Sequence, residues 1–426
     1  MKDIGKAVLI LIYLALAVPM FYFSEGFLSI GGFGFMYMYL FGMGIIALAI
    51  IVFLISPDVK HGALSVQYAI RLAAPYTWSL VYSIPFWAFT MAAFRIITRG
   101  LFYVVYQYIA ILVAAAALYL FGSKGIYYQF LALALSDVIL MIQMIRENGA
   151  AEFVSEYIDV IVSVTAETGP IMKVFESTEH CFAVAFFLVY FLLDFKKNKS
   201  RLPWFIAGVF LFFLGLKRSV LISAIAAVII GGLLILFMKK STRKIMMTIA
   251  AVTAVLGVVY IVAIRYGLYD WLEQVGLETS GRSWIFDSVK SWYELGVGYL
   301  GRGIGYVSGS LSTGALSLVR SDGYSVADVH NDLLRQYIEL GCLGYIVWLI
   351  IFLQYRIRYF FHKQETEEDR RHGILTGAVL VTLFVTLMTD NTLYYFYTTM
   401  FSSIVIMGYR YEEYAGKIKL PGEESS

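Results

Sequence analysis

Charged residues are scarce in this chain of 426 residues: they make up 15% of it, against 60% hydrophobic residues. So few charges cannot cover a water-facing surface, so the composition excludes a soluble globular protein and predicts an all-α polytopic membrane protein. Cysteine is also rare, since the chain has only Cys181 and Cys342, and both lie in or beside apolar runs. The sequence therefore gives no support to a disulfide framework or a thiolate metal site.

Two sequence signals are also missing. The first apolar run follows Lys2 and Lys6 but has no small-residue cleavage site, so we expect a retained membrane anchor and no cleaved signal peptide. The segments expected outside the membrane contain no Asp-x-Asp and no His/carboxylate cluster with metal-ligand spacing. We therefore expect neither a metal ion nor another cofactor.

Long apolar runs recur along the chain. A helix needs ~20 residues to cross a bilayer, and flanking polar residues that snorkel can complete the shorter runs. The pattern predicts about twelve transmembrane helices in a single integral membrane domain over residues 1–426. The runs lie near residues 7–23, 33–55, 74–94, 101–121, 126–144, 178–195, 203–216, 219–238, 245–264, 337–355, 373–389 and 393–409.

Lysine and arginine clusters between these runs predict the orientation. Basic residues gather near the N-terminus and at 196–201, 239–244 and 356–371. Because cytoplasmic loops carry an excess of Lys and Arg, we expect both chain termini in the cytoplasm. The polar segment 265–336 is then a large extracytoplasmic loop between the ninth and tenth helices.

Several basic residues fall on the expected outer side, where the same rule disfavours them. Lys217 and Arg218 occupy a tight turn between two spans, and Arg95 and Arg99 stand near the start of another. Snorkelling to lipid headgroups explains Arg95 and Arg99 as well as a function does. It explains Arg218 less well, because a cation in a minimal turn gains little by reaching for headgroups. The alternative is an anion held at the outer face.

The 265–336 loop holds the densest polar stretch of the chain. Its Gly301-Arg-Gly-Ile-Gly305 turn could point N–H groups at an anion, although a flexible connection is the simpler interpretation. Asp328 is a candidate N-cap for a helix that continues into the membrane, which puts His330 in the first exposed turn of that helix. The candidate site residues of this loop are Arg265, Arg282, Arg302, Arg320, His330, Asn331 and Arg335.

A second outer segment, 145–178, is rich in acidic residues. Its apolar residues recur at helical spacing, which predicts a helix lying along the membrane surface. Glu179 and His180 follow at the start of the next span. A His at such a boundary is more often an interfacial polar tip than a catalyst, so we treat both residues as secondary candidates.

The order of these motifs resembles a known family. The short turn Gly215-Leu-Lys-Arg-Ser219 is followed by Ser280-Gly-Arg-Ser-Trp284, by the Gly301–Gly305 turn and by His330-Asn-Asp-Leu-Leu334. Over about residues 200–355 this is similar to the O-antigen ligase and O-antigen polymerase family of bacterial envelope glycosyltransferases. The first half of the chain matches that family only in hydropathy. The family often has Ser-Arg-Gly in the turn where this chain has Lys-Arg-Ser.

The resemblance implies a GT-C-type membrane glycosyltransferase. Its donor and acceptor would be undecaprenyl-diphosphate-linked glycans, used at the outer face of the bacterial cytoplasmic membrane. The lipid bilayer is then its surroundings, and a flippase and a chain-length regulator are candidate protein partners. No nucleic-acid partner is expected.

The residues themselves fit such chemistry. Arginines neutralise a diphosphate leaving group through bidentate hydrogen bonds, so we expect Arg218 and Arg282 to bind it, with Arg265 in support. His330 is the expected general base that takes the proton of the acceptor hydroxyl. We expect metal-independent transfer, and the resemblance together with direct displacement implies inversion at the sugar. The secondary candidates are Lys217, Arg302, Arg320, Arg335, Glu179, His180 and Asn331.

Three functions stay open at this point. We prefer a polymerase of O-antigen, capsule or exopolysaccharide over an O-antigen ligase, because a ligase requires a lipid A core acceptor that only some envelopes contain. The motifs do not separate the two. A twelve-helix secondary transporter shares the helix count, but such proteins usually have two similar halves with substrate groups at mid-membrane. Here only the second half carries the long polar loop.

Overall fold

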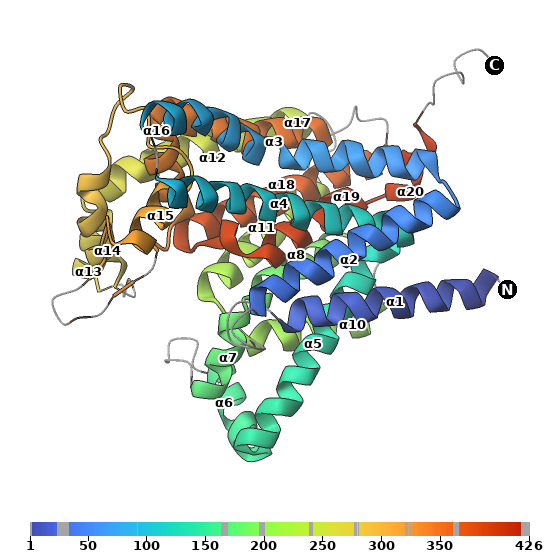
Figure 1. The fold of residues 1–426 in the computed structure, drawn as a ribbon. Helices are drawn as coiled ribbons and strands as arrows, with labels where there is room; N and C mark the ends of the chain where they lie inside the picture. The colour runs from blue at the N-terminus through green and yellow to red at the C-terminus, as the bar shows by residue number, and fades with distance from the viewer. Residues whose placement is uncertain are drawn as a thin grey trace, which may run out of the picture. The chain divides into compact units, whose positions relative to one another are not determined.

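The computed structural model describes residues 2–23, 34–91, 93–162, 169–195, 201–237, 242–276, 279, 281–319, 323, 325–326, 328–360 and 366–418. Helices dominate these residues (Figure 1), and their one extended pairing is an isolated bridge between Val319 and Ser325. The predicted all-α class is confirmed for this part of the chain.

Seven helical stretches in the described ranges are long and apolar enough to cross a membrane, in agreement with a multi-pass membrane protein. One of them, 94–148, contains α4 (Phe94–Phe121), the short η1 (Gly122–Lys124) and α5 (Gly125–Asn148). The pair α7 (Pro170–Thr178) and α8 (His180–Leu193) is a further candidate, bent by 66°. The other candidates lie in α1 (Lys2–Tyr22), α2 (Gly34–Ile55), α11 (Arg218–Phe237), α12 (Thr242–Arg265), the stretch Asp332–Phe360 and α18 (Glu367–Thr389).

Two of the expected spans are short helices. The runs at 203–216 and 393–409 form α10 (Leu202–Leu214) and α19 (Phe396–Gly408), each of 13 residues. At 1.5 Å per residue, each covers about 20 Å of a hydrocarbon core that is ~30 Å thick. Residues 74–89 of the run at 74–94 belong to α3 (Val59–Phe89), a helix of 31 residues that begins well before the run.

The helices form two compact units. Unit 1 comprises Met1–Leu72, Tyr108–Phe237 and Tyr395–Ser426, and unit 2 comprises Ala73–Gln107 and Met238–Tyr394. Helices α3 and α4 contribute residues to both units. Each unit has its own buried central helix.

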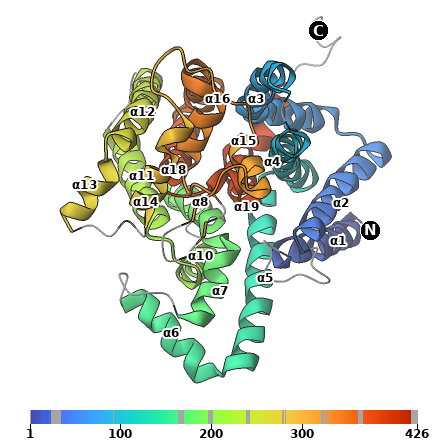
Figure 2. The same cartoon turned by 60° about the vertical axis from the view of Figure 1, so that its left-hand side comes forward.

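Helix α8 is the centre of unit 1. Nearly all of its residues are buried, and α5, α10, α11 and α19 pack against it (Figure 2). Stacked aromatic rings form two of these contacts. The ring centres of Phe130 of α5 and Phe187 lie 4.0 Å apart, and those of Phe205 of α10 and Phe191 lie 5.2 Å apart. The helix predicted within 145–178 is present as α6 (Ala150–Val162), followed by α7, and its position at a membrane surface stays a prediction. The last helix of the unit is α20 (Tyr411–Gly416).

Helix α16 (Asp332–Leu349) is the centre of unit 2. All of its residues from 332 to 341 are buried, and α12, α15 (Tyr306–Thr313) and α18 pack against it. It continues into the π-helix η4 (Ile350–Tyr355) and α17 (Arg356–Phe360). Helices α13 (Leu268–Gln274) and α14 (Arg282–Val289) contact α12, and both lie near one end of it in Figure 2. The short helices η3 (Lys290–Trp292) and η5 (Thr392–Tyr394) complete the unit.

A glycine crossing fixes the loop of unit 2 against α16. Gly341 lies within α16 but has φ 64° and ψ −175°, and Gly301 of the loop has φ 90°. A Cβ on either residue would collide with the backbone of the other, so both positions require glycine. The N–H groups of Arg302 and Gly303 donate to the carbonyl of Glu339 at 3.0 and 2.8 Å. The glycine-rich turn is therefore a fixed crossing, and its interpretation as a flexible connection was wrong.

The predicted orientation can be tested by labelling this loop. Ala315 follows α15 and is exposed. In a variant that has Cys181 and Cys342 replaced by Ala, Ala315→Cys should react with a membrane-impermeant maleimide added to intact cells, because the basic clusters place the loop outside. Lys124→Cys, at an exposed position expected inside, is the control and should react only after permeabilisation. If Ala315→Cys also reacted only after permeabilisation, the loop would lie in the cytoplasm and the proposed site could not be extracytoplasmic.

Candidate functional site

His330 stands immediately before α16 with φ 49°, a conformation that residues with a Cβ rarely adopt. Its side chain is 42% exposed, and its Nδ1 lies 3.7 Å from Oδ1 of Asp390 and 3.4 Å from Nδ2 of Asn391. Asp390 is buried and follows the end of α18. A partly exposed imidazole with a carboxylate beside one nitrogen can take a proton from a hydroxyl at the other.

Asn331 fixes the segment that carries His330. Its Oδ1 accepts a hydrogen bond from the N–H of Leu334 at 2.9 Å and so caps α16, and its Nδ2 donates to the carbonyl of Met388 at 2.9 Å. The N-cap is therefore Asn331, and its prediction at Asp328 was wrong. His330 precedes the helix and does not stand in its first turn.

Arg335 is buried beneath this segment, with 1% of its side chain exposed. Its Nη2 contacts the carboxylate of Asp332, its Nη1 lies 3.6 Å from Oδ2 of Asp328, and the ring centre of Tyr394 lies 3.8 Å from its Cζ. The two aspartates flank His330 in the sequence, so one guanidinium holds both ends of residues 328–332. Arg335 is thus placed to position His330, and its burial keeps it from contact with a substrate.

Arg282, the first residue of α14, reaches the loop formed by residues 389–391. Its Nη2 donates to the carbonyl of Thr389 at 2.8 Å, and its Nη1 donates to the carbonyl of Thr279 at 3.4 Å. His330 contacts Asp390 and Asn391 of the same loop. The 389–391 loop therefore brings together two residues that the sequence predicted for one site: an arginine for the leaving group and a base.

The other predicted arginines of unit 2 differ in their surroundings. Arg265 donates from Nη1 to the carbonyl of Lys290 at 2.7 Å, and its guanidinium lies 5.6 Å from the ring centre of Tyr293. This arginine therefore ties α12 to η3. Arg302 is exposed beside the glycine crossing. Arg320 lies outside the residues that the structure describes.

Lys217 and Arg218 belong to unit 1. Arg218 is the first residue of α11 and is exposed, and Nζ of Lys217 lies 3.9 Å from Oε1 of Glu176. The turn before them packs closely against α7, because a Cβ on Gly215 would collide with the carbonyl of Phe175. A small turn thus presents two neighbouring cations, and the role of Arg218 as a diphosphate ligand stays a prediction.

Glu179 and His180 form a buried junction where α8 begins. Glu179 has φ 61° at the bend between α7 and α8. Nδ1 of His180 lies 2.6 Å from Oδ1 of Asp137 on α5, with the two side chains 5% and 3% exposed. The rings of Phe21 and Tyr397 lie edge-on to the imidazole at 5.7 and 5.0 Å. His180 is therefore a buried, paired residue, and its interpretation as an interfacial polar tip was wrong.

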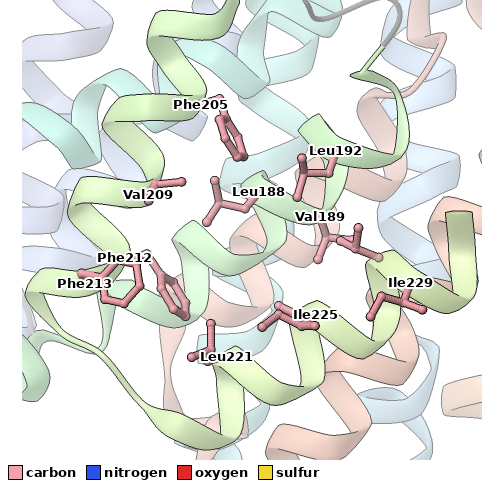
Figure 3. Close-up of a pocket in the computed structure, with 12 residues that line it drawn as sticks. Leu188, Val189, Leu192, Phe205, Val209, Phe212, Phe213, Leu221, Ile225 and Ile229 are labelled. Atoms are coloured by element: carbon pink, nitrogen blue, oxygen red, sulfur yellow. The ribbon is translucent and has the colours of Figure 1, made fainter. Parts of the chain in front are cut away.

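An apolar cavity of about 250 Å³ lies between α8, α10 and α11 of unit 1 (Figure 3). Leu221 of its lining follows Arg218 by three residues on α11, so the two share one face of that helix. A cavity lined only by hydrocarbon side chains suits a hydrocarbon chain. The lining residues are Leu188, Val189, Leu192, Phe205, Val209, Phe212, Phe213, Leu221, Ala224, Ile225, Val228 and Ile229.

The carboxylates around His330 form no metal site. Asp328 and Asp332 contact Arg335, and Asp390 lies beside His330. Within the described ranges, no three His, Cys, Asp or Glu side chains gather in a way that could hold a metal ion. Metal-independent transfer stays a prediction.

None of the site residues predicted from the sequence lies in the 389–391 loop. Asp390, Asn391 and Thr392 are the polar residues between the last two apolar runs, and Thr389 before them is polar as well. The orientation rule places that break on the same side as the 265–336 loop. These two signals together could have added Asp390 to the candidate residues.

The position of Arg335 generates a stability prediction. Arg335→Met should lower the free energy of unfolding by about 3–5 kcal/mol, because it leaves the buried carboxylate of Asp332 without its cation. Arg302→Met is the control and should change the free energy by no more than about 0.5 kcal/mol, since Arg302 is exposed. Thermal or denaturant unfolding of the purified protein measures both. Equal stability of Arg335→Met and wild type would contradict the clamp on residues 328–332.

No protein-family model and no curated protein sequence matches this chain. The resemblance to the O-antigen ligase and polymerase family therefore remains an expectation from the motifs.

Proposed function

We propose that this protein is a polysaccharide polymerase. It transfers an undecaprenyl-diphosphate-linked glycan to a sugar hydroxyl of another lipid-linked repeat unit at the outer face of a bacterial cytoplasmic membrane. The proposed architecture is GT-C-type, with about twelve transmembrane helices and both termini in the cytoplasm. The observation that carries the proposal is the convergence of His330 and Arg282 on the 389–391 loop.

His330 acts as the general base in this proposal. Its exposure of 42% leaves the imidazole accessible to an acceptor hydroxyl, and Asp390 stabilises the imidazolium that forms when the proton arrives. The cap at Asn331 and the clamp at Arg335 hold the imidazole in place before the substrate binds. Such preorganisation lowers the barrier of a displacement reaction.

Arg282 stabilises the leaving diphosphate in this proposal, with Arg265 in support, and Arg218 of unit 1 is a further proposed ligand that rests on the sequence motifs alone. The acceptor oxygen forms its bond to the anomeric carbon while the bond from that carbon to the diphosphate oxygen breaks. The hydroxyl proton goes to His330, and the electron pair of the broken bond leaves with the diphosphate. Fixed cations stabilise that developing negative charge without a metal ion. Direct displacement inverts the configuration at the anomeric carbon of the transferred sugar.

The apolar cavity of unit 1 supports a lipid-linked substrate. Its lining is entirely aliphatic and aromatic, and the face of α11 that lines it begins at Arg218. A polyprenyl diphosphate combines a hydrocarbon chain with an anionic headgroup. The apolar cavity suits the hydrocarbon chain, and the cations of the turn at Lys217 and Arg218 suit the anionic headgroup.

Two alternatives remain. The same base and cations would serve an O-antigen ligase, which differs only in its acceptor. The bend of 66° between α7 and α8, with the buried His180–Asp137 pair beside it, favours a secondary transporter as the second candidate, because broken helices with buried titratable groups are typical of those proteins. Proton-dependent solute uptake that is lost in Asp137→Asn and kept in His330→Gln would identify a transporter.

The role of the base can be tested with two variants. His330→Gln should reduce polymer formation by roughly 10²–10⁴-fold, since Gln keeps a neutral hydrogen bond but takes no proton near pH 7. Asp390→Asn should reduce it by a smaller factor, because the imidazole remains while its carboxylate partner is lost. Polymer yield and length are measured in a strain that lacks the native protein, with membrane levels of each variant matched. Near-normal polymer from His330→Gln would mean that His330 is not the base.

The role of the arginines calls for substitutions that keep the charge. Arg282→Lys and Arg218→Lys each retain a cation but lose the bidentate fork, so polymer formation should fall sharply at normal protein levels. Arg95→Lys, at an exposed position outside the proposed site, is the matched control and should have little effect. Activity should also persist in a chelator. Loss of activity that Mg²⁺ or Mn²⁺ restores would contradict the metal-independent mechanism.

A further inference from the structure

A second pocket lies in unit 2, beside the glycine crossing. Its volume is about 230 Å³, smaller than the pockets of 300–1,000 Å³ that hold drug-sized ligands. This size suits a small ligand or one ring of a longer chain. It is lined by Ser291, Trp292, Tyr293, Glu294, Gly298, Tyr299, Leu300, Gly301 and Arg302.

The lining combines hydrogen-bond donors, acceptors and aromatic rings. Glu294 and Arg302 are exposed and supply a carboxylate and a guanidinium. Trp292 and Tyr299 supply aromatic rings.

A ligand for this pocket must accept from Arg302 and donate to Glu294. Sugar hydroxyls do both, whereas an inorganic anion would meet the carboxylate of Glu294 unfavourably.

The pocket lies along α16 from His330. The hydroxyl of Tyr299 donates to the carbonyl of Ile338 at 2.7 Å, and the hydroxyl of Tyr337 donates to the carbonyl of Glu294 at 3.0 Å. Tyr337 and Ile338 follow the start of α16 by five and six residues, which is about 8–9 Å along the helix axis. The pocket therefore lies within about two helical turns of the end of α16 that carries His330.

We propose that this pocket is a saccharide subsite that holds one sugar ring of the acceptor glycan while another sugar of that glycan presents its hydroxyl to His330. The inference rests on the proposed function, to which it adds a binding site for the acceptor. Because the glycine crossing fixes the loop, the subsite exists before the acceptor binds.

Saturation-transfer NMR on the full-length protein tests the subsite directly. The protein is placed in phospholipid nanodiscs free of sugar detergents, and the ligands are glucose, galactose, rhamnose and N-acetylglucosamine. At least one should bind to the wild type, with affinity weakened about threefold to tenfold by Arg302→Met and by Glu294→Gln. Asp287→Asn removes an exposed carboxylate of α14 outside the pocket and should leave binding unchanged.

Three results would overturn the subsite: none of the four sugars binds, both pocket variants bind as the wild type does, or inorganic phosphate displaces the sugar. Both pocket variants should keep the thermal stability of the wild type, because Arg302 and Glu294 are exposed, so a loss of sugar binding would not reflect misfolding. Sugar binding without transfer would contradict the proposed function alone. Transfer without variant-sensitive binding would contradict the subsite alone.

Discussion

The buried guanidinium of Arg335 is the constraint on which the site in unit 2 depends. An unpaired charge in the interior of an apolar helix bundle is too costly to persist, so Arg335 requires carboxylates within reach. It has Asp332 one turn before it on α16 and Asp328 beyond the start of that helix. Since the arginine is fixed in the bundle, the chain segment that carries both aspartates is fixed with it.

His330 lies within that held segment, and its unusual backbone conformation follows from this. A positive φ at a residue with a Cβ costs free energy and persists only where the surroundings determine it. Asn331 caps α16 and donates a hydrogen bond to the carbonyl of Met388. Arg335 holds the aspartates on either side of His330, Asp328 and Asp332. These contacts aim the imidazole at the 389–391 loop.

The composition alone predicted the all-α membrane fold, because sparse charge and long apolar runs leave no other class. The motif order predicted His330 and Arg282, which the structure brings to one loop. It did not predict Asp390, since a pair between residues 330 and 390 depends on how α16 and α18 pack. The anion-binding role considered for Arg335 illustrates a second limit. Charge along a sequence does not tell whether a cation meets a substrate or a carboxylate of its own chain, although Asp332 at i−3 was a local signal for the latter.

Two His–Asp pairs in this chain show why accessibility separates structure from chemistry. His180 and Asp137 lie closer together, at 2.6 Å against 3.7 Å for His330 and Asp390, so distance alone would favour the pair in unit 1 as the catalytic one. A general base must also touch the proton that it removes. The side chain of His180 is 5% exposed and lies against Phe21 and Tyr397, whereas that of His330 is 42% exposed. A sugar hydroxyl can reach His330 without unpacking the bundle but cannot reach His180. The looser, open pair is therefore the better base, and the tighter pair joins α5 to α8.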